Sequence, residues 1–191
     1  MEKLRSALGF GGILTAKDID LVVSHYQIRI LKPDEHFQEF GKIANKIAFV
    51  NEGILRVYGT DDLGDDVTKY FIRENQFFAN LESYYSKQPA TDAIQAVVQT
   101  ELYVIHTMVK EKLTKQIPNL YILQKSITEA TLLSKIKDND FLNFGNAKTK
   151  YLEFVKRYPT LALQIPQQYI ASYLKITPQS LSRIRKDILK K

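Results

Sequence analysis

The sequence predicts an α+β chain in which a strand-rich N-terminal domain precedes a long helix and a compact helical domain. Three observations predict this order. Short segments rich in Val, Ile, Tyr and Phe alternate with turn-forming residues within positions 27–105. A stretch with apolar residues three and four positions apart follows at 119–137. Residues 165–190 then form two short helical patterns around a tight turn, and the second of them is rich in cations.

Local signals place the N-terminal elements. Thr15 can cap a helix over residues 15–26, because its hydroxyl can accept a hydrogen bond from a backbone N–H in the first turn. Beyond this helix the predicted strands lie at 27–31, 35–40, 43–50, 54–58, 67–72 and 93–105. Turn signals interrupt them at Lys32-Pro-Asp, at Asn51-Glu-Gly and in the acidic run 60–66. Many short strands with such breaks predict a sandwich or a barrel.

The long helix predicted at 119–137 carries one apolar stripe, made of Leu120, Leu123, Ile127, Ala130 and Leu133. Such a stripe is typical of a dimer seam, and a helix packed on its own domain shows the same pattern. The stripe alone leaves both interpretations open. Asp138-Asn-Asp is a polar break suited to a hinge, and a further helix is predicted over 146–158, before Pro159.

The C-terminal segment has the pattern of a helix-turn-helix. Pro166 suits the first turn of a helix, because the N–H that it lacks has no partner there, and an apolar stripe follows at Ile170, Ala171 and Leu174. Thr177 and Pro178 supply an N-cap hydroxyl and then proline at the first helical position. One face of this second helix is apolar, with Leu181, Ile184 and Ile188. Side chains that can contact base edges or phosphates form the other face, at Gln179, Ser180, Ser182, Arg183 and Lys186.

Positive charge is concentrated at the same end of the chain. From residue 148 onward there are ten Lys and Arg and two acids, Glu153 and Asp187. The 147 residues before them carry seventeen bases and nineteen acids, so the whole formal excess of +6 lies in the C-terminal quarter. This asymmetry indicates nucleic acid rather than a membrane surface, because no strongly hydrophobic helix face accompanies the cations. An ordinary helical hairpin with a solvated basic surface is the alternative that the pattern leaves open.

Residues that the chain lacks exclude several classes of protein. Without cysteine there is no disulfide framework, iron–sulfur cluster or cysteine zinc site. No targeting segment and no stretch approaching eighteen apolar residues is present, so we expect a cytoplasmic protein without a membrane partner. No paired metal spacing, phosphate-binding glycine loop or Ser-His-acid grouping appears, so we expect no enzyme, metal or cofactor. A metal-binding cupin enzyme is the weakest alternative, because Glu35, His36 and Glu39 cannot all point to one face of a strand.

Two segments carry a resemblance to a known family. Residues 166–186 have the sequence PQQYIASYLKITPQSLSRIRK and line up without a gap on the helix-turn-helix of the cyclic-AMP receptor/Fnr (Crp/Fnr) transcription regulators, in the form common in the Bacteroidetes. Residues 49–58, FVNEGILRVY, are similar to the family's strand-turn-strand around a glycine. The order of the elements resembles the family over nearly the whole chain. The resemblance implies a sequence-specific DNA-binding regulator with a cyclic-nucleotide-binding-like β-jelly-roll domain at 1–116, a dimerisation helix and hinge at 117–138, and a helix-turn-helix domain at 139–191.

The resemblance assigns roles to residues of the C-terminal domain. Bases are expected to be contacted by Gln179 and Arg183, and phosphates by Gln168, Thr177, Ser180 and Lys186. Two residues depart from the family pattern. Lys175 stands where the turn usually has glycine, which is unfavourable if the turn needs positive φ, and Pro178 stands where many members place a base-reading arginine, which implies a different target sequence. No hairpin wing follows the second helix in this sequence, so backbone contacts from a wing are expected to be missing.

The family also implies partners. Its operators are two-fold symmetric, so the resemblance implies a homodimer whose seam is the stripe from Leu120 to Leu133. Double-stranded DNA and a second copy of the chain are therefore the expected partners, and RNA polymerase is compatible with this role. The sequence does not identify a small-molecule effector.

The segment 77–93 corresponds to the family's cyclic-nucleotide cassette. A glycine, a carboxylate, an arginine and a hydroxyl are needed there, and the four positions hold Ala79, Asn80, Ala90 and Thr91. Only the hydroxyl remains, so we expect that cyclic AMP does not bind in the usual way. Lys69 and Lys87 are more typical of solvated lysines than of a replacement cation. The aromatic side chains of this segment either line a pocket for another ligand or belong to the core; they are Phe77, Phe78, Tyr84 and Tyr85.

A second alternative is not enzymatic. The chain would then be a protein-interaction module with a cyclic-nucleotide-like fold, and its basic tail would only add solubility. That hypothesis predicts no DNA binding for Arg183→Ala to change, whereas a DNA reader loses specific affinity in this variant.

Overall fold

A computed structural model describes residues 1–189, apart from the side chains of Asn139 and Leu189. Lys190 and Lys191, which belong to the predicted helix-turn-helix domain, lie outside the described residues. The chain divides into two compact units. Unit 1 consists of Met1–Val57 and Phe71–Ala130, and unit 2 consists of Tyr58–Tyr70 and the chain from Thr131 onward.

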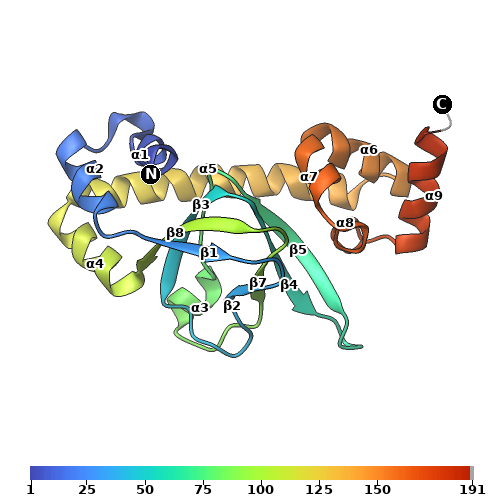
Figure 1. Ribbon diagram of the computed structural model, residues 1–191, viewed down its shortest axis with the longest axis horizontal. Helices are drawn as coiled ribbons and strands as arrows, with labels where there is room; N and C mark the ends of the chain where they lie inside the picture. The colour runs from blue at the N-terminus through green and yellow to red at the C-terminus, as the bar shows by residue number, and fades with distance from the viewer. Residues whose placement is uncertain (190–191) are drawn as a thin grey trace. The chain divides into compact units, whose positions relative to one another are not determined.

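Two four-stranded antiparallel sheets form the β-domain (Figure 1). The first has the order β1 (Gln27–Leu31), β8 (Thr100–His106), β3 (Lys46–Glu52) and β6 (Phe77–Phe78). The second has the order β2 (His36–Gln38), β7 (Ala93–Ala96), β4 (Ile54–Thr60) and β5 (Asp66–Arg73). Apart from β4 and β5, which are consecutive, neighbouring strands are far apart in the sequence, as in a jelly roll. The predicted strand-rich domain and the α+β class are confirmed.

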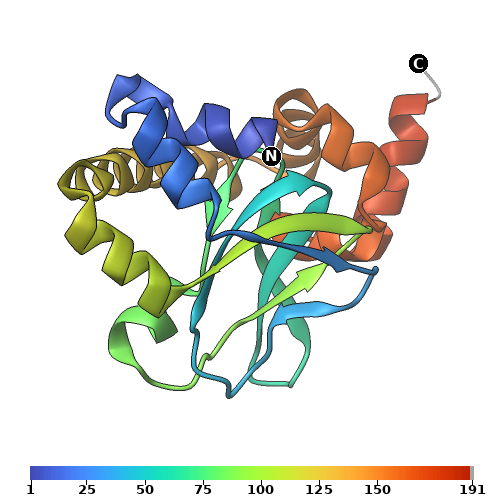
Figure 2. The same cartoon turned by 60° about the vertical axis from the view of Figure 1, so that its left-hand side comes forward.

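Helices cover one face of the first sheet (Figure 2). They are α1 (Glu2–Leu8), the short η1 (Phe10–Gly12), α2 (Ala16–Val23), α4 (Thr107–Gln116) and the beginning of α5 (Pro118–Asn143). The core between them and the sheet is made of Leu4, Leu8, Leu14, Val22, Val23, Tyr26, Phe49, Tyr103, Ile105, Leu113, Ile117, Leu120 and Leu123. Thr15 caps α2 as predicted, because its Oγ accepts from the backbone N–H of Asp18 at 3.2 Å. Alternation along β3 turns Ala48 and Val50, both fully buried, to the opposite face of the sheet from Phe49.

Gly53 makes the turn between β3 and β4. Its φ is +106°, and a Cβ at this position would lie 2.7 Å from the carbonyl oxygen of Gln99. Only glycine therefore fits this turn without displacing backbone. The observation gives a physical reason for the strand-turn-strand pattern seen at residues 49–58.

The single strand predicted over 93–105 is wrong. The chain forms β7 and β8 instead, and the two strands lie in different sheets. Hydrogen bonds turn the chain between them: the N–H of Val97 donates to the carbonyl of Ile54 at 2.8 Å, and the hydroxyl of Thr100 donates to the carbonyl of Val98 at 2.8 Å. The first of these bonds is made to a β4 residue that lies more than forty positions away in the sequence, so apolar composition alone gave no sign of the break.

Unit 2 is mainly helical. It contains the second half of α5, α6 (Ala147–Arg157), α7 (Pro159–Gln164), α8 (Gln167–Leu174) and α9 (Pro178–Leu189). Its buried side chains include Phe141, Leu142, Tyr151, Phe154, Leu161, Ile170, Leu174 and Leu181. Tyr173 of α8 packs edge-on against Phe154 of α6 and Phe141 of α5, with ring centroids 5.8 and 6.2 Å away. Side chains from α5 and α6 thus hold α8 in place.

The helix break predicted at Asp138-Asn-Asp is also wrong, because α5 continues through these residues to Asn143. Asp138 is held in the helix by an ion pair with Arg157, 3.5 Å away, and by the hydroxyl of Tyr158. The helix ends just before Gly145, whose φ is +88°. Asn146 then caps α6, with its Oδ1 accepting from the N–H of Thr149 at 3.0 Å, and α6 is the helix predicted over 146–158.

Candidate nucleic-acid interface

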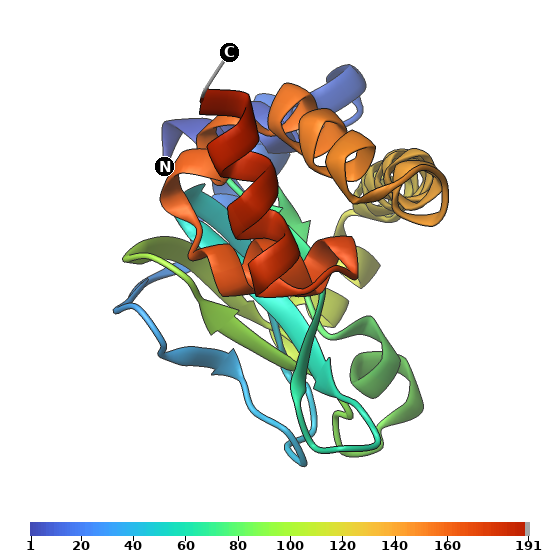
Figure 3. The ribbon, with the colours of Figure 1, turned by 90° about the vertical axis from the view of Figure 1, so that its right-hand side faces the viewer.

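Helices α8 and α9 form a helix-turn-helix with a three-residue linker, seen in Figure 3 with α9 towards the viewer. Their facing sides are apolar. Ile170, Ala171 and Leu174 of α8 and Leu181 of α9 are all completely buried. The stripe that the sequence predicted for α8 is therefore the surface against which α9 packs.

The linker starts in a left-handed conformation at Lys175. Its φ is 56° and its ψ is 45°, and its N–H donates to the carbonyl of Ser172 at 3.1 Å. The next N–H, of Ile176, donates to the carbonyl of Ala171 at 3.0 Å. These two bonds define a Schellman motif in which Lys175 takes the position that usually holds glycine. The turn does need positive φ, and a residue with a Cβ costs about 1 kcal/mol there.

Thr177 caps α9 and shares a hydrogen bond with Ser180. The Oγ of Thr177 accepts from the N–H of Ser180 at 3.1 Å, and the two hydroxyl oxygens are 2.9 Å apart. One of the two hydroxyl protons is used between these side chains. The pair can therefore donate one hydroxyl hydrogen bond to a phosphate rather than two.

The residues predicted to contact DNA lie at the surface of α8, the linker and α9. Gln168, Thr177, Gln179, Arg183 and Lys186 are exposed, and Ser180 is half-buried. On α9 the spacing of four and three residues brings Gln179, Arg183 and Lys186 to one side of the helix, away from the buried Leu181. Within residues 1–189 no acidic side chain forms an ion pair with Arg183 or Lys186. This side of α9 therefore offers two unpaired cations to an anionic partner.

The residues at the four cassette positions of the β-domain are either buried or hydrogen-bonded to neighbouring residues. Asn80 caps α3 (Leu81–Ser86): its Oδ1 accepts from the N–H of Ser83 at 3.1 Å, and its Nδ2 donates to the carbonyl of Asp92 at 3.2 Å. Ala79 and Ala90 are buried, with exposures of 8% and 5%. The exposed Thr91 has its hydroxyl 3.4 Å from the Glu82 carboxylate. A phosphate at this hydroxyl would meet a negative charge.

The aromatic residues near the cassette belong mainly to the core. Phe77 packs on Phe49 with ring centroids 4.9 Å apart, Phe78 contacts Phe37 edge-on at 4.8 Å, and Tyr84 is buried, whereas Tyr85 is 75% exposed. Tyr84 donates its hydroxyl to Glu111 at 3.1 Å, and burial together with this bond raises the pKa of Tyr84 to about 12. The ammonium of Lys87 lies over the Tyr84 ring at 4.5 Å.

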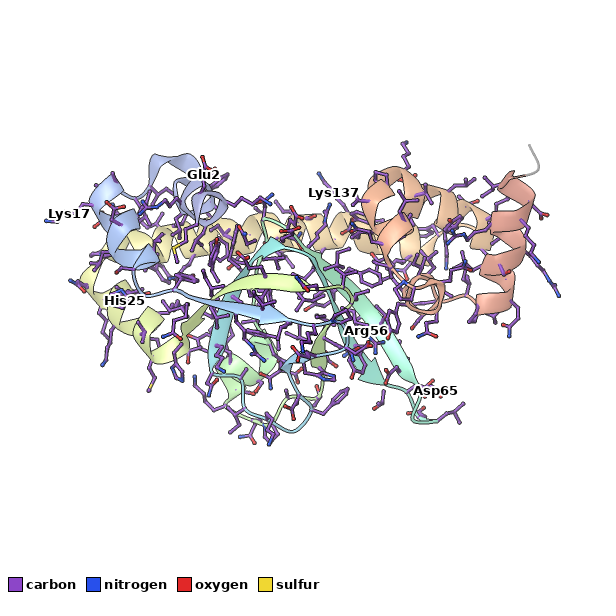
Figure 4. The ribbon with its side chains drawn as sticks, in the orientation of Figure 1. Glu2, Lys17, His25, Arg56, Asp65 and Lys137 are labelled. Carbon is purple, nitrogen blue, oxygen red and sulfur yellow. The ribbon has the colours of Figure 1, made fainter. Side chains whose placement is uncertain are left out.

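One buried cation in the β-domain was not anticipated. Arg56 of β4, labelled in Figure 4, is only 3% exposed. Its Nε donates to the Oε1 of Gln95 on β7 at 2.8 Å. Gln95 in turn donates to the carbonyl of Asp34 at 3.0 Å. Both faces of β4 are buried from Ile54 to Gly59, so the alternation of side chains along this strand gave no sign that Arg56 is buried.

The apolar stripe of α5 is divided between two surroundings, which corrects the predicted seam. Leu120 and Leu123 are 4% and 1% exposed and lie in the core of unit 1, with Ile127 packed against them. Ala130 is exposed, and Leu133 is 61% exposed. Leu120 and Leu123 therefore pack on their own domain, because the helices at the N-terminus cover them. The exposed apolar residues of α5 are Tyr121, Ile122, Leu132, Leu133 and Ile136.

No group of three His, Cys, Asp or Glu within residues 1–189 is placed to hold a metal ion. Glu35, one of the three residues weighed for a cupin site, accepts from the N–H of Lys32 at 2.8 Å. Among the helices of these residues, none is both long enough and apolar enough to cross a bilayer.

Comparison with solved structures gives the fold a name. A protein from Eubacterium rectale, assigned to the Crp/Fnr family of transcriptional regulators, matches with a TM-score of 0.72 and 14% identity, over 93% of this chain and 85% of the other. The chain has the Crp/Fnr fold. FixK2 from Bradyrhizobium japonicum matches with a TM-score of 0.70 and 19% identity, over 86% of this chain and 85% of FixK2. The catabolite activator protein of Thermus thermophilus matches with a TM-score of 0.58 and 19% identity, over 96% of this chain and 87% of that protein.

The Crp/Fnr fold is established by structure and not by sequence. No family model matches the sequence. No curated protein matches it either. At identities of 14 to 19%, the similarity to solved structures establishes only the fold.

Proposed function

We propose that this chain is a Crp/Fnr-type transcription regulator that binds double-stranded DNA in a sequence-specific manner through α9. The observation that carries this proposal is the exposed side of α9, where Gln179, Arg183 and Lys186 face solvent while Leu181 anchors the helix. A helix of this kind fits a major groove, and arginine can donate two hydrogen bonds to the O6 and N7 of guanine. The net positive charge of the C-terminal quarter supports the proposal by favouring a polyanion.

Within this proposal Gln179 and Arg183 contact bases, and Arg183 contributes most to specificity. Phosphates are contacted by Gln168, Thr177, Ser180 and Lys186. Because Thr177 and Ser180 share one hydroxyl proton, they act as a single donor to one phosphate. Pro178 starts α9 in place of a base-reading arginine, so the target sequence differs from that of family members with arginine there.

The proposed regulator is a homodimer, because two recognition helices related by a two-fold axis read two half-sites one helical turn apart. Because Leu120 and Leu123 are buried in the core of unit 1, the proposed dimer seam consists of exposed apolar residues of α5. Leu132, Leu133 and Ile136 are 58%, 61% and 52% exposed and lie within one and a half turns of the helix. Burial of these side chains against a second copy would stabilise the dimer through the hydrophobic effect.

Cyclic AMP is not the effector in this proposal. The cyclic phosphate requires a cation and close backbone N–H groups, and the corresponding positions hold the buried Ala79 and Ala90. The side chain of Asn80 is used at both ends to cap α3 and to bind Asp92. A lost charge-assisted hydrogen bond alone removes about 1.5–3 kcal/mol.

As a regulator the protein acts in the cytoplasm, and RNA polymerase is the partner through which a bound regulator alters transcription. The interaction-module hypothesis keeps the same fold and differs in having no DNA target. The exposed cations of α9 favour the DNA reader, because an interaction module has no requirement for unpaired Arg183 and Lys186 on one side of a helix.

The test is a selection from a random pool of DNA duplexes with the purified protein at about 0.15 M salt. Parallel selections use Arg183→Ala, the matched control Arg5→Ala in unit 1, and the native chain with cyclic AMP. The proposal predicts a two-fold-symmetric site that the native chain and Arg5→Ala enrich, that Arg183→Ala does not, and that cyclic AMP leaves unchanged. Absence of enrichment by the native chain would favour the interaction module.

A further inference from the structure

Residues other than glycine with positive φ mark strained places in this backbone. They are Asp34, Asn75, Lys87 and Lys175, with φ between 56° and 69°. Asp and Asn tolerate the left-handed conformation, because their short polar side chains can bond locally. The two lysines gain no such help from their side chains, so each raises the question of why glycine or asparagine is not used there.

Lys87 has a contact within the chain that accounts for its side chain. It ends α3 at φ 59°, and its ammonium lies over the ring of Tyr84 at 4.5 Å. The ammonium of Lys110 also lies over this ring, 5.8 Å from its centroid. A glycine at position 87 would relieve the backbone and lose this cation–π contact.

Lys175 has the same backbone conformation and a different environment. Its side chain is exposed, and among residues 1–189 its ammonium makes no hydrogen bond, ion pair or ring contact. Neither α8 nor the linker 175–177 contains an acidic residue, and the one acid of α9 is Asp187, in its last turn. The side chain therefore has no partner within the described chain that could explain its place in a strained turn.

The place of Lys175 in the helix-turn-helix points to a partner outside the chain. It follows the last residue of α8 and precedes Thr177, the cap of α9, by two residues. In a helix-turn-helix the first helix crosses the DNA backbone and the N-terminal part of the second reads base edges. The linker between them thus lies beside the phosphates at the edge of the groove. Lysine carries three donors on a long flexible stem and binds phosphate as a point charge.

We propose that Lys175 binds a DNA phosphate, and that this contact is the reason for a lysine in the left-handed turn. The inference rests on the proposed function and deepens it, since it adds a backbone contact at a position where glycine can offer only its N–H. A phosphate contact carries no sequence information, so Lys175 contributes to affinity and to the position of α9 rather than to the choice of bases.

The experiment measures DNA affinity against salt by fluorescence anisotropy, using the duplex selected by the native chain and an unrelated duplex. The variants are Lys175→Asn, Lys175→Arg and the matched control Lys87→Asn, which removes one lysine from a left-handed position outside the helix-turn-helix. Asparagine tolerates positive φ, so Lys175→Asn removes the ammonium without adding strain. Thermal unfolding of each variant checks that its fold is intact.

The inference predicts that Lys175→Asn lowers the slope of log affinity against log salt by about 0.9, the value for one phosphate contact. At 0.15 M salt this corresponds to about fivefold weaker binding, on both duplexes, with the difference vanishing near 1 M. Lys175→Arg and Lys87→Asn should follow the native salt dependence. The inference is overturned if the native chain binds its site and Lys175→Asn binds with the native slope. If the native chain binds neither duplex, it is the proposed function that fails.

Discussion

The guanidinium of Arg157 lies 3.5 Å from the carboxylate of Asp138, and this pair joins the last turn of α6 to the C-terminal half of α5. The same guanidinium donates to the carbonyl of Lys137 at 3.1 Å and to Glu153 at 2.7 Å, and it lies over the ring of Phe141 at 4.8 Å. Figure 4 marks Lys137 on this part of α5. The end of α5 is therefore built into the helix-turn-helix unit and is not a free linker.

Replacing Arg157 should destabilise unit 2. Arg157→Ala removes a hydrogen bond to a backbone carbonyl, two ion pairs that are about one-third exposed and a cation–π contact, so we expect a loss of about 1–2 kcal/mol in the free energy of unfolding. Urea unfolding followed by circular dichroism measures this change. Arg5→Ala is the control, because Arg5 has one exposed ion pair, with Asp20, and should lose at most about 0.5 kcal/mol. Equal losses in the two variants would contradict the role given to Arg157.

The pair of Glu153 and Arg157 should make stability depend on pH. The hydrogen bond from Arg157 lowers the pKa of Glu153 in the folded chain, so its contribution is present above the ordinary pKa of a glutamate, about 4.3, and is lost as pH falls through the lower folded value. Native protein should therefore be more stable than Glu153→Gln at pH 7, and the difference should shrink by pH 3. Urea unfolding at both pH values measures it. A difference that persists unchanged at pH 3 would show that the carboxylate charge is not involved.

Two leucines of α5 should separate folding from dimerisation. Leu123 is buried in the core of unit 1, so Leu123→Ala should cost about 2–5 kcal/mol of stability, whereas the exposed Leu133→Ala should leave the fold intact and weaken the dimer. Denaturant unfolding measures the first effect and sedimentation equilibrium the second. A dimer that Leu133→Ala leaves unaffected would place the seam elsewhere.

Lys175→Gly should stabilise the folded chain. Glycine adopts the left-handed conformation of the turn without a Cβ penalty, while a flexible glycine also raises the entropy of the unfolded chain, so we expect a gain of about 0.5 kcal/mol. Thermal and urea unfolding measure it. In Lys87→Gly the gain should be smaller, because that variant also loses the contact between Lys87 and Tyr84. A destabilised Lys175→Gly would mean that the lysine side chain contributes to the fold.

Much of the fold could be predicted because its signals are local. Thr15, Asn146 and Thr177 cap helices through bonds to residues three positions ahead, and each cap is visible in the sequence. Gly53 marks a turn that no residue with a Cβ fits. The helix-turn-helix follows from the apolar spacing of α8 and α9, which the buried Ile170 and Leu181 satisfy.

The wrong predictions concern places where residues distant in the sequence determine the local structure. Asp138 remains helical because Arg157 and Tyr158, about twenty positions later, bind its side chain. The stripe of α5 is divided because the N-terminal helices cover Leu120 and Leu123, and no local pattern tells a core from a dimer seam. The strand over 93–105 is broken because β4 binds the chain at Val97.

The central claim is that the exposed side of α9 reads a DNA sequence, and the most direct test is a titration of the native chain and Arg183→Ala against the selected duplex. The same proteins are titrated against a duplex with both half-sites scrambled. The account predicts that Arg183→Ala loses about 1–3 kcal/mol of binding to the selected duplex and much less on the scrambled one. Native-like affinity of Arg183→Ala for the selected duplex would contradict it.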